Sequence, residues 1–147
     1  MSCLKLRLMD ILACPYDKTF PLELYIIETR YYGERDVKVR TKPLCELYCA
    51  REGKKVEELE KQGIEPDCVE CLKTEVSEGI LYCRKCGRWY PIIDEIPILL
   101  PDDLRDKKAD LEFLRKHLEV FKSKYGEDKA KAIFYEGKPW SLEQKQG

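Results

Sequence analysis

The chain has 147 residues, of which 44% are apolar and 37% charged, and its 27 basic and 28 acidic side chains leave a formal net charge of -1. This composition allows one small core and disfavours a dedicated nucleic-acid binder, whose phosphate contacts need a basic excess. No apolar run approaches the roughly 18 residues of a membrane span, and residues 1–12 lack a signal peptide's uninterrupted apolar stretch, so we expect a cytoplasmic protein without membrane contact.

The first predicted elements are a helix and a strand. Apolar residues at positions 4, 8, 11 and 12 follow a helical period, so we expect a helix over residues 4–12 that Pro15 ends. Alternating apolar residues then predict a strand over Leu22–Glu28, and Val37 and Val39 indicate a weaker strand.

Residues 42–78 have a different character. Pro43 is typical of a helix start, Gly53 and Gly63 are typical of helix ends, and the stretches between them are rich in Glu and Lys. We expect three short surface helices here, the last one beginning at Pro66-Asp67.

Strand chemistry returns after Gly79 and gives way to helices after Pro101. β-branched and aromatic residues predict strands over 80–83, 88–93 and 96–100, with Asp94-Glu95 as a tight connection between the last two. An apolar stripe at 111, 114, 118, 121 and 125 predicts a long helix that Gly126 ends, followed by a short helix over 127–135 and a tail from Gly137.

Two counts bear on the chemistry of the chain. It contains eight cysteines, no asparagine and only three glutamines. Scarce amides beside abundant Lys and Glu are expected of a protein from a thermophile. Cysteines in a reducing cytosol favour metal ligands, whereas hyperthermophiles also tolerate intracellular disulfides, so both fates stay open.

The most specific motif is Cys83-Arg84-Lys85-Cys86-Gly87. Two thiolates at this spacing can bind one tetrahedral zinc ion where the backbone curls tightly, and a glycine eases that curl. Flanking strands place the motif at a hairpin tip, as in a zinc ribbon. The alternatives are a redox pair or a simple turn, and the redox pair is disfavoured because no helix follows to lower a thiol pKa.

Two sets of residues can complete this site. Cys68 and Cys71 are nearest in sequence, but the interval is shorter than in the usual ribbon and they follow a helix start. Cys14 lies instead between a helix and a strand, in a turn like the partner loop of a ribbon. Asp17 follows it by three residues, and its carboxylate is an acceptable zinc ligand that binds less tightly than a fourth thiolate.

A family resemblance rests on two stretches of the chain. These are Leu8-Met9-Asp10-Ile11-Leu12-Ala13-Cys14-Pro15 and residues 79–97, with the string C-x2-C-G-x-x-Y-P-I-x-D-x-I-P. Together they resemble the small zinc-ribbon activator subunit of tRNA, rRNA and release-factor methyltransferases, in a form with a helical insertion and C-terminal helices. The resemblance covers about residues 4–28 and 79–104.

The resemblance implies an α+β fold, with a zinc-ribbon-like antiparallel sheet, an N-terminal helix, an inserted helical segment and C-terminal helices. The ribbon domain is expected over 1–28 plus 79–104, the insertion over 29–78 and the helical extension over 105–147. The family's zinc ligands correspond to Cys14, Cys83 and Cys86, whereas Asp17 replaces the fourth cysteine. The ribbon can then use Asp17 as a ligand, bind zinc weakly or stand without metal; we expect a bound or labile zinc.

Four cysteines remain as a second set. Cys45 and Cys49 are spaced i, i+4, and Cys68 and Cys71 are spaced i, i+3, so each pair shares a helix face. They are predicted to form a second zinc site or two disulfides that stabilise the insertion, with plain buried cysteines as the alternative. Cys3 is interpreted as a small apolar residue.

The chain is predicted not to be an enzyme. Its one histidine, His117, lies on a charged helix and is interpreted as a solvated surface residue. Without a better-placed histidine no nucleophile triad can be assembled in the usual way, and no phosphate loop or dinucleotide fingerprint occurs.

The apolar strands point to a partner protein. A ribbon this small cannot cover both sheet faces, and we expect the C-terminal stripe to pack over one of them. The resemblance implies that class I S-adenosylmethionine-dependent methyltransferases bind the other, by strand addition in a heterodimer, with the methyl donor and RNA reached only through the partner. The predicted interface comprises Leu4, Leu8, Ile11, Ile92, Ile96, Pro97, Ile98 and Leu99.

Two other functions compete with this prediction. One is a free-standing zinc-ribbon module that binds RNA or a ribosomal or transcription complex, which the near-zero net charge disfavours. The other is a thiol oxidoreductase, which needs one thiol of low pKa. Arg84, Lys85 and Arg88 can extend a partner's RNA-binding surface, although such charges more often solvate a turn.

Overall fold

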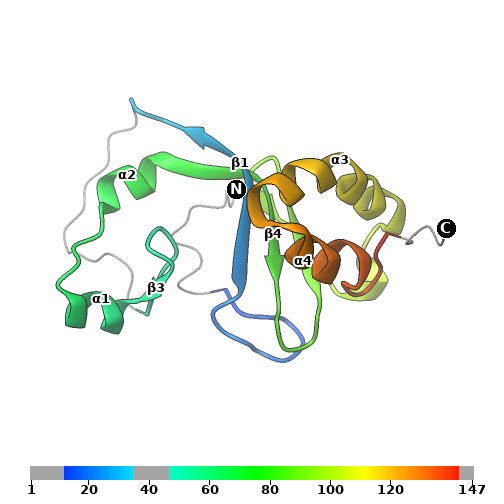
Figure 1. The fold of residues 1–147 in the computed structure, drawn as a ribbon, viewed down its shortest axis with the longest axis horizontal. Coiled ribbons are helices and arrows are strands. Elements are labelled where there is room, and N and C mark those ends of the chain that lie inside the picture. The colour runs from blue at the N-terminus through cyan, green and yellow to red at the C-terminus, as the bar shows by residue number, and fades with distance from the viewer. Residues whose placement is uncertain (1–11, 35–46, 143–147) are drawn as a thin grey trace.

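The computed structural model describes residues 12–34 and 47–142, and its centre is an antiparallel sheet. The strands are β1 (Glu23–Tyr31), β4 (Thr74–Tyr82), β5 (Trp89–Ile93) and β6 (Ile96–Pro97), in the spatial order β1-β4-β5-β6. Helices flank the sheet (Figure 1). The predicted α+β, zinc-ribbon-like fold is therefore confirmed.

The first two sheet strands are longer than predicted. β1 and β4 pair from Glu23↔Tyr82 to Tyr31↔Thr74, with register shifts next to Glu28, whereas the sequence patterns suggested strands only over 22–28 and 80–83. Gly79 lies in the middle of β4, where an added Cβ would come 2.7 Å from the backbone oxygen of Tyr25. Only glycine allows this close approach of the two strands.

The segment between β1 and β4 is only partly helical. A two-stranded hairpin, β2 (Tyr48–Cys49) and β3 (Lys54–Lys55), precedes the helices α1 (Val56–Gln62) and α2 (Cys68–Lys73). Gly53, with φ at 66°, turns this hairpin instead of ending a helix, so the expected first helix is wrong over the described residues. Gly63 ends α1 and Asp67 caps α2, as predicted.

The C-terminal part consists of helices that pack on one face of the sheet. The 3-10 turn η2 (Asp102–Leu104) leads into α3 (Lys107–Tyr125), α4 (Glu127–Ala130) and the π-helical turn η3 (Lys131–Tyr135). α3 and α4 lie on the side of the sheet away from α1 and α2 (Figure 1). The prediction that this region packs over a sheet face is confirmed, and the predicted break at Gly126 is also observed.

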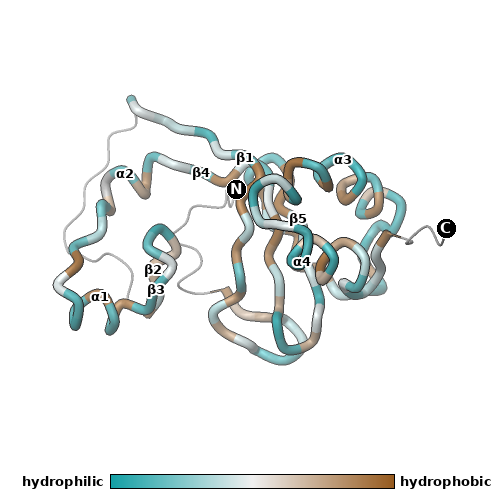
Figure 2. The backbone as a smooth tube through the Cα atoms, viewed as in Figure 1, coloured by the Kyte–Doolittle hydropathy of each residue, from teal (hydrophilic) through white to brown (hydrophobic). Residues whose placement is uncertain are grey.

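Two apolar clusters result, and alternate residues of the strands enter different ones, as in Trp89 and Tyr90. Apolar stretches lie in the strands of the sheet and in parts of the helices (Figure 2). We call the two apolar clusters the helix-covered cluster and the knuckle-side cluster. The first consists of Tyr25, Ile27, Ile80, Trp89, Phe113, Leu114, Phe121, Ala130, Ile133 and Phe134. The second consists of Cys14, Leu22, Cys71, Val76, Leu81, Cys83, Tyr90 and Ile92.

The prediction that His117 is a solvated surface residue is wrong. The side chain was expected on the solvated face of its helix, but it is only 6% exposed. It follows Phe113 and Leu114 on the face of α3 that packs on the sheet, and its ring lies 4.6 Å from that of Phe113. Burial lowers the pKa of His117, although Glu78 Oε2 lies 3.6 Å from Nε2.

Candidate metal centre

Two loops with matching hydrogen bonds form the candidate site. In the second loop, which joins β4 to β5, Cys83 N–H donates to Arg88 O and Gly87 N–H donates to Cys83 O. In the first loop, ahead of β1, Cys14 N–H donates to Thr19 O and Lys18 N–H donates to Cys14 O. The four distances lie between 2.8 and 3.0 Å. Both loops are thus knuckles of one kind, although only one carries the C-x2-C sequence.

The knuckles differ at the residue that closes the curl. Gly87 has φ at 78° and Lys18 has φ at 62°, both in the left-handed region. This conformation is easy for glycine and strained for lysine. The first knuckle therefore lacks the glycine that marks the second one in the sequence.

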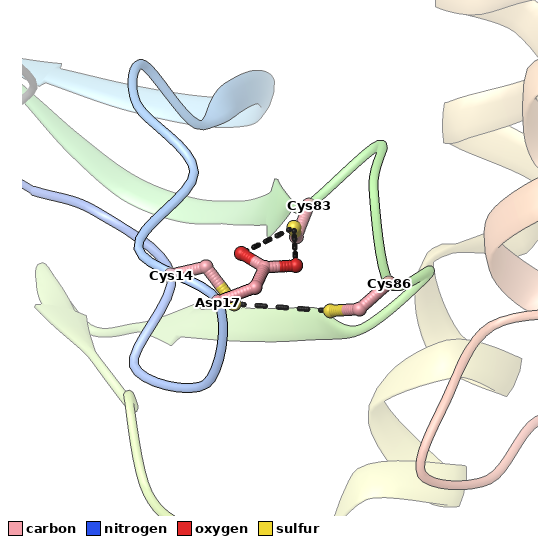
Figure 3. Close-up of side chains that lie close together, drawn as sticks. All are labelled: Cys14, Asp17, Cys83 and Cys86. Atoms are coloured by element: carbon pink, nitrogen blue, oxygen red, sulfur yellow. Dashed lines mark hydrogen bonds between the residues drawn. The ribbon is translucent and has the colours of Figure 1, made fainter.

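The knuckles bring four possible ligands together. Cys14 Sγ, an Asp17 carboxylate oxygen, Cys83 Sγ and Cys86 Sγ all lie within 4.8 Å of one another (Figure 3). Cys14 Sγ is 3.8 Å from Cys86 Sγ, and Cys83 Sγ is 3.4 Å from Asp17 Oδ2. A tetrahedral zinc with S and O ligands needs edges of about 3.8 Å between sulfurs and about 3.5 Å between sulfur and oxygen. The residues present fit a zinc ion.

The electrostatics of the two possible ligands in the first knuckle, Cys14 and Asp17, favour the binding of a cation. Hydrogen bonds from Thr19, including its N–H at 3.0 Å, hold the pKa of Asp17 well below its usual range. Burial opposes ionisation of Cys14, but hydrogen bonds from the Asp17 backbone, the Tyr90 hydroxyl and the Tyr16 backbone outweigh it and lower the pKa. Asp17 is therefore a carboxylate at neutral pH, ready to bind a metal.

A polar contact joins the knuckles to the chain after β6. The Arg88 guanidinium stacks on the Tyr16 ring and forms a bidentate pair with Asp102, whose N–H donates to the Tyr16 hydroxyl. Arg88 is thus engaged within the chain, whereas Arg84 and Lys85 remain exposed. Of the three charges considered for an RNA surface, these last two are the exposed ones, and Arg84 Nη1 also donates to Pro21 O at 3.1 Å.

The remaining described cysteines lie elsewhere. Cys49, Cys68 and Cys71 are buried in the insertion, and burial raises the pKa of Cys71 to about 11. Over residues 12–34 and 47–142, the four-residue knuckle group is the one set of three or more Cys, His, Asp or Glu side chains whose ligand atoms lie close enough to share a metal ion. Cys49 and Cys71 are not joined in a disulfide. Because Cys45 lies outside the described residues, the second zinc site or disulfide pairing of Cys45 with Cys49, Cys68 and Cys71 stays a prediction; Cys3 also lies outside them.

The predicted partner surface is partly exposed. Ile96 is 43% exposed, and Pro97, Ile98 and Leu99 are half-buried. Ile92 is 0% exposed in the knuckle-side cluster, because its side chain points to the opposite sheet face from that of its exposed neighbour Ile93. We therefore remove Ile92 from the interface. Leu4, Leu8, Ile11 and the helix over 4–12 lie outside the described residues, as do Val37 and Val39.

Among the described residues no helix has both the length and the apolar character needed to cross a membrane.

No curated protein and no solved structure matches the chain. The family model for Trm112p-like proteins matches residues 5–95, which include both knuckles and end in the β5–β6 turn. This match spans more than half of the chain and confirms the resemblance, so the chain belongs to the Trm112p-like family of small activators of tRNA and rRNA methyltransferases.

Proposed function

We propose that this protein is a non-catalytic, cytoplasmic subunit that stabilises and activates class I S-adenosylmethionine-dependent methyltransferases. The partner would methylate tRNA, rRNA or a translation factor. It would bind through the edge of β6 and the residues that follow, in a heterodimer. The single observation that carries the proposal is that β6 is the sheet edge left open among the described residues.

The opposite edge of the sheet is already occupied. The Tyr125 hydroxyl bonds both Ile26 N–H and Ile26 O, at 2.7 and 3.1 Å, and Lys124 Nζ donates to Ile27 O at 2.9 Å. These outward backbone groups of β1 are the ones that an added strand would use. The end of α3 therefore disfavours strand addition at β1.

The outer edge of β5 is occupied as well. Lys138 N–H donates to Gly87 O and Trp89 N–H donates to Lys138 O, so the C-terminal segment pairs beside the start of β5. Further along, Ile98 N–H donates to Pro91 O. The outer side of β6 remains, with Ile96 and Leu100 exposed by 43% and 40%. An apolar edge of this kind is suited to a partner strand.

For the metal we propose zinc, held by Cys14, Asp17, Cys83 and Cys86. Bound zinc would supply a structural cross-link between the knuckles, with no part in the methyl transfer. The contacts of Arg88 and Tyr16 with Asp102 would then fix the end of residues 96–101 relative to the two knuckles. We also keep as a proposal the division into 1–28 plus 79–104, 29–78 and 105–147.

Activation would follow from binding linkage. A subunit that binds only the folded methyltransferase raises the population of that state by mass action. S-adenosylmethionine and the catalytic groups would belong to the partner, and RNA would contact this chain only indirectly. Arg84 and Lys85, at the tip of the second knuckle, would extend the RNA-binding surface of the partner within the complex, so this chain would meet RNA only when the partner is bound.

Co-expression tests the proposal. The protein is produced with each class I methyltransferase of the same organism, and co-purification, methyltransferase solubility and zinc content are measured. We expect at least one partner to be captured and made soluble. Ile96→Asp should abolish capture, because it puts a charge into the apolar edge.

Val120→Asp is the matched control for that substitution. Val120 is 44% exposed, on α3 away from the β6 edge, so capture should persist. A protein that captures no methyltransferase and instead binds RNA alone, in a salt-dependent way, would contradict the proposal in favour of the free-standing module.

A further inference from the structure

The turn between β5 and β6 has an unfavourable backbone for its sequence. Ile93 pairs with Ile96, so Asp94 and Glu95 form a two-residue hairpin loop. Their φ angles are 50° and 70°, the pattern of a type I′ turn, for which Asn-Gly and Asp-Gly are the preferred pairs. A glutamate in the second position needs contacts from elsewhere to hold this conformation.

Those contacts come from the far end of β1. The Tyr32 hydroxyl donates to Glu95 Oε1 at 2.8 Å, and Arg30 Nη1 lies 3.3 Å from Glu95 Oε2 and 2.7 Å from Asp94 Oδ1. The Glu95 backbone is held too, since its N–H donates to Ser77 O at 3.0 Å. Glu95 is thus fixed at both its backbone and its carboxylate.

The Glu95 contacts outweigh the Asp94 pair. The Arg30 and Asp94 side chains are 45% and 71% exposed, and an ion pair so open to water contributes little. The Glu95 side chain is only 11% exposed, so its bonds to Arg30 and Tyr32 are shielded and costly to lose.

We propose that Arg30 and Tyr32 are positioning residues for the methyltransferase-binding edge, acting through Glu95 on the β5–β6 turn. This inference rests on the proposed function. The turn sets the register of β6, and a slip by one residue would move each side chain to the opposite face. Glu95 in the left-handed conformation therefore keeps Ile96 and Ile98 on the faces that they now occupy.

Tyr32→Phe tests the proposal, with Tyr31→Phe as the matched control. Tyr31 is the adjacent tyrosine, and its hydroxyl also donates to a carboxylate, that of Glu70 at 2.6 Å, away from the turn. One readout is amide hydrogen exchange at Ile98, whose N–H bonds Pro91 O across the β5 edge. The other is the Kd for the methyltransferase captured in the co-expression experiment.

We expect Tyr32→Phe to speed Ile98 exchange by about tenfold and to weaken partner binding by a similar factor, as expected for loss of a hydrogen bond to a charged group. Arg30→Ala should act in the same direction. Tyr31→Phe should change neither readout. Equal effects of Tyr31→Phe and Tyr32→Phe, or no effect of Tyr32→Phe, would overturn the proposal.

Glu95→Gly supplies a second and sharper test. It removes the contact but creates the preferred Asp-Gly pair, so exchange and Kd should stay near those of the wild type. Adding Tyr32→Phe to Glu95→Gly should then have no further effect, because the hydroxyl has lost its partner. A full Tyr32→Phe effect in the glycine background would overturn the proposal.

The two proposals fail in different ways. If the wild-type protein binds no methyltransferase, the proposed function is wrong, and Ile98 exchange in the free protein still decides whether Tyr32 holds the turn. If the wild type binds and Tyr32→Phe binds equally well, the positioning role alone is wrong.

Discussion

The two faces of the central sheet are completed in different ways. The helix-covered face is closed by this chain's own aromatic side chains, with Trp89, Phe121 and Phe134 fully or almost fully buried. The knuckle side has a smaller cluster that includes two of the proposed metal ligands and borders on the partly buried Leu12 and Leu99. One face is therefore closed by the chain itself, whereas we propose that the other is completed by a metal ion and borders on the edge that the partner covers.

A buried ion pair stabilises the helix-covered face. Arg105 Nη2 lies 2.8 Å from Asp110 Oδ2, and the guanidinium lies over the Trp89 ring at 4.6 Å. Trp140 Nε1–H donates to Asp110, and Trp89 Nε1–H donates to Trp140 O. The segment predicted as a tail from Gly137 is thus part of the fold, because it satisfies these buried polar groups.

Removing an aromatic side chain from the closed face should have the largest effect. We expect Phe121→Ala to lower the free energy of unfolding by about 3–5 kcal/mol, the usual cost of emptying a core site of this size. The loss should be the same with zinc and with a chelator, as measured by urea unfolding. A loss that appears only in the chelator would contradict the independence of the two faces.

Removing the metal should destabilise the knuckle side. At a free zinc concentration of 100 times its Kd, zinc should contribute about 2.7 kcal/mol to the unfolding free energy, and chelation should remove it. Cys83→Ala should lose both the zinc and the response to chelator, as measured by metal analysis and urea unfolding.

The buried Cys49, in the insertion, supplies the control for Cys83. Cys49→Ala should cost packing but keep one zinc per chain. Loss of a zinc equivalent in Cys49→Ala would instead show the second metal site that involves Cys45, Cys68 and Cys71. Asp17→Cys should make zinc harder to remove by chelator, because a fourth thiolate replaces an oxygen; easier removal would contradict the tetrahedral assignment.

Substitutions at the positive-φ residues of the two knuckles, Gly87 and Lys18, should change the stability by smaller amounts and in opposite directions. Gly87→Ala should destabilise the protein by about 1 kcal/mol, because alanine disfavours positive φ while its Cβ meets no atom within 4 Å. Lys18→Gly should stabilise it by up to about 1 kcal/mol, because glycine relieves the strain at the matching position. Thermal unfolding with zinc present measures both, and changes of the same sign would show that the knuckles are not equivalent.

The smallest effect should be the pH dependence of the stability that arises from His117, on the helix-covered face. Burial is the main cause that lowers the pKa of His117 from the ordinary histidine value of about 6.5. Below that value the unfolded chain takes up a proton before the folded one does. Stability should therefore be complete above pH 6.5 and fall as the pH drops toward the lowered folded pKa. His117→Gln should lose this part of the slope in urea unfolding at fixed zinc, whereas a rise in wild-type stability at low pH would show that the Glu78 pairing dominates.

Local patterns predicted many of the elements. The knuckle at Cys83–Gly87, the cap at Asp67 and the break at Gly126 all depend on neighbours in sequence, and all three are observed. The Cys14 and Asp17 part of the site came from the same local reasoning together with the family resemblance. Strand lengths were underestimated, because pairing with a partner strand extended β1 and β4 beyond their apolar alternation.

The incorrect predictions concern the burial of side chains. His117 and Ile92 were assigned to exposed surfaces from their position in a helix or strand, yet both are buried. Periodicity tells which residues share a face, but burial depends on the element that packs there. The turn contacts of Arg30 and Tyr32 with Glu95 join residues more than 60 positions apart, and no local signal predicted them.

By itself, therefore, the sequence indicated the two knuckles, the four strands of the main sheet, the C-terminal helices and the family, because these depend on spacing and local backbone preference. The tertiary structure alone decided which sheet face is sealed, which edges are occupied and how the β5–β6 turn is held. Those properties depend on long-range packing and hydrogen bonds, which form only when distant segments meet.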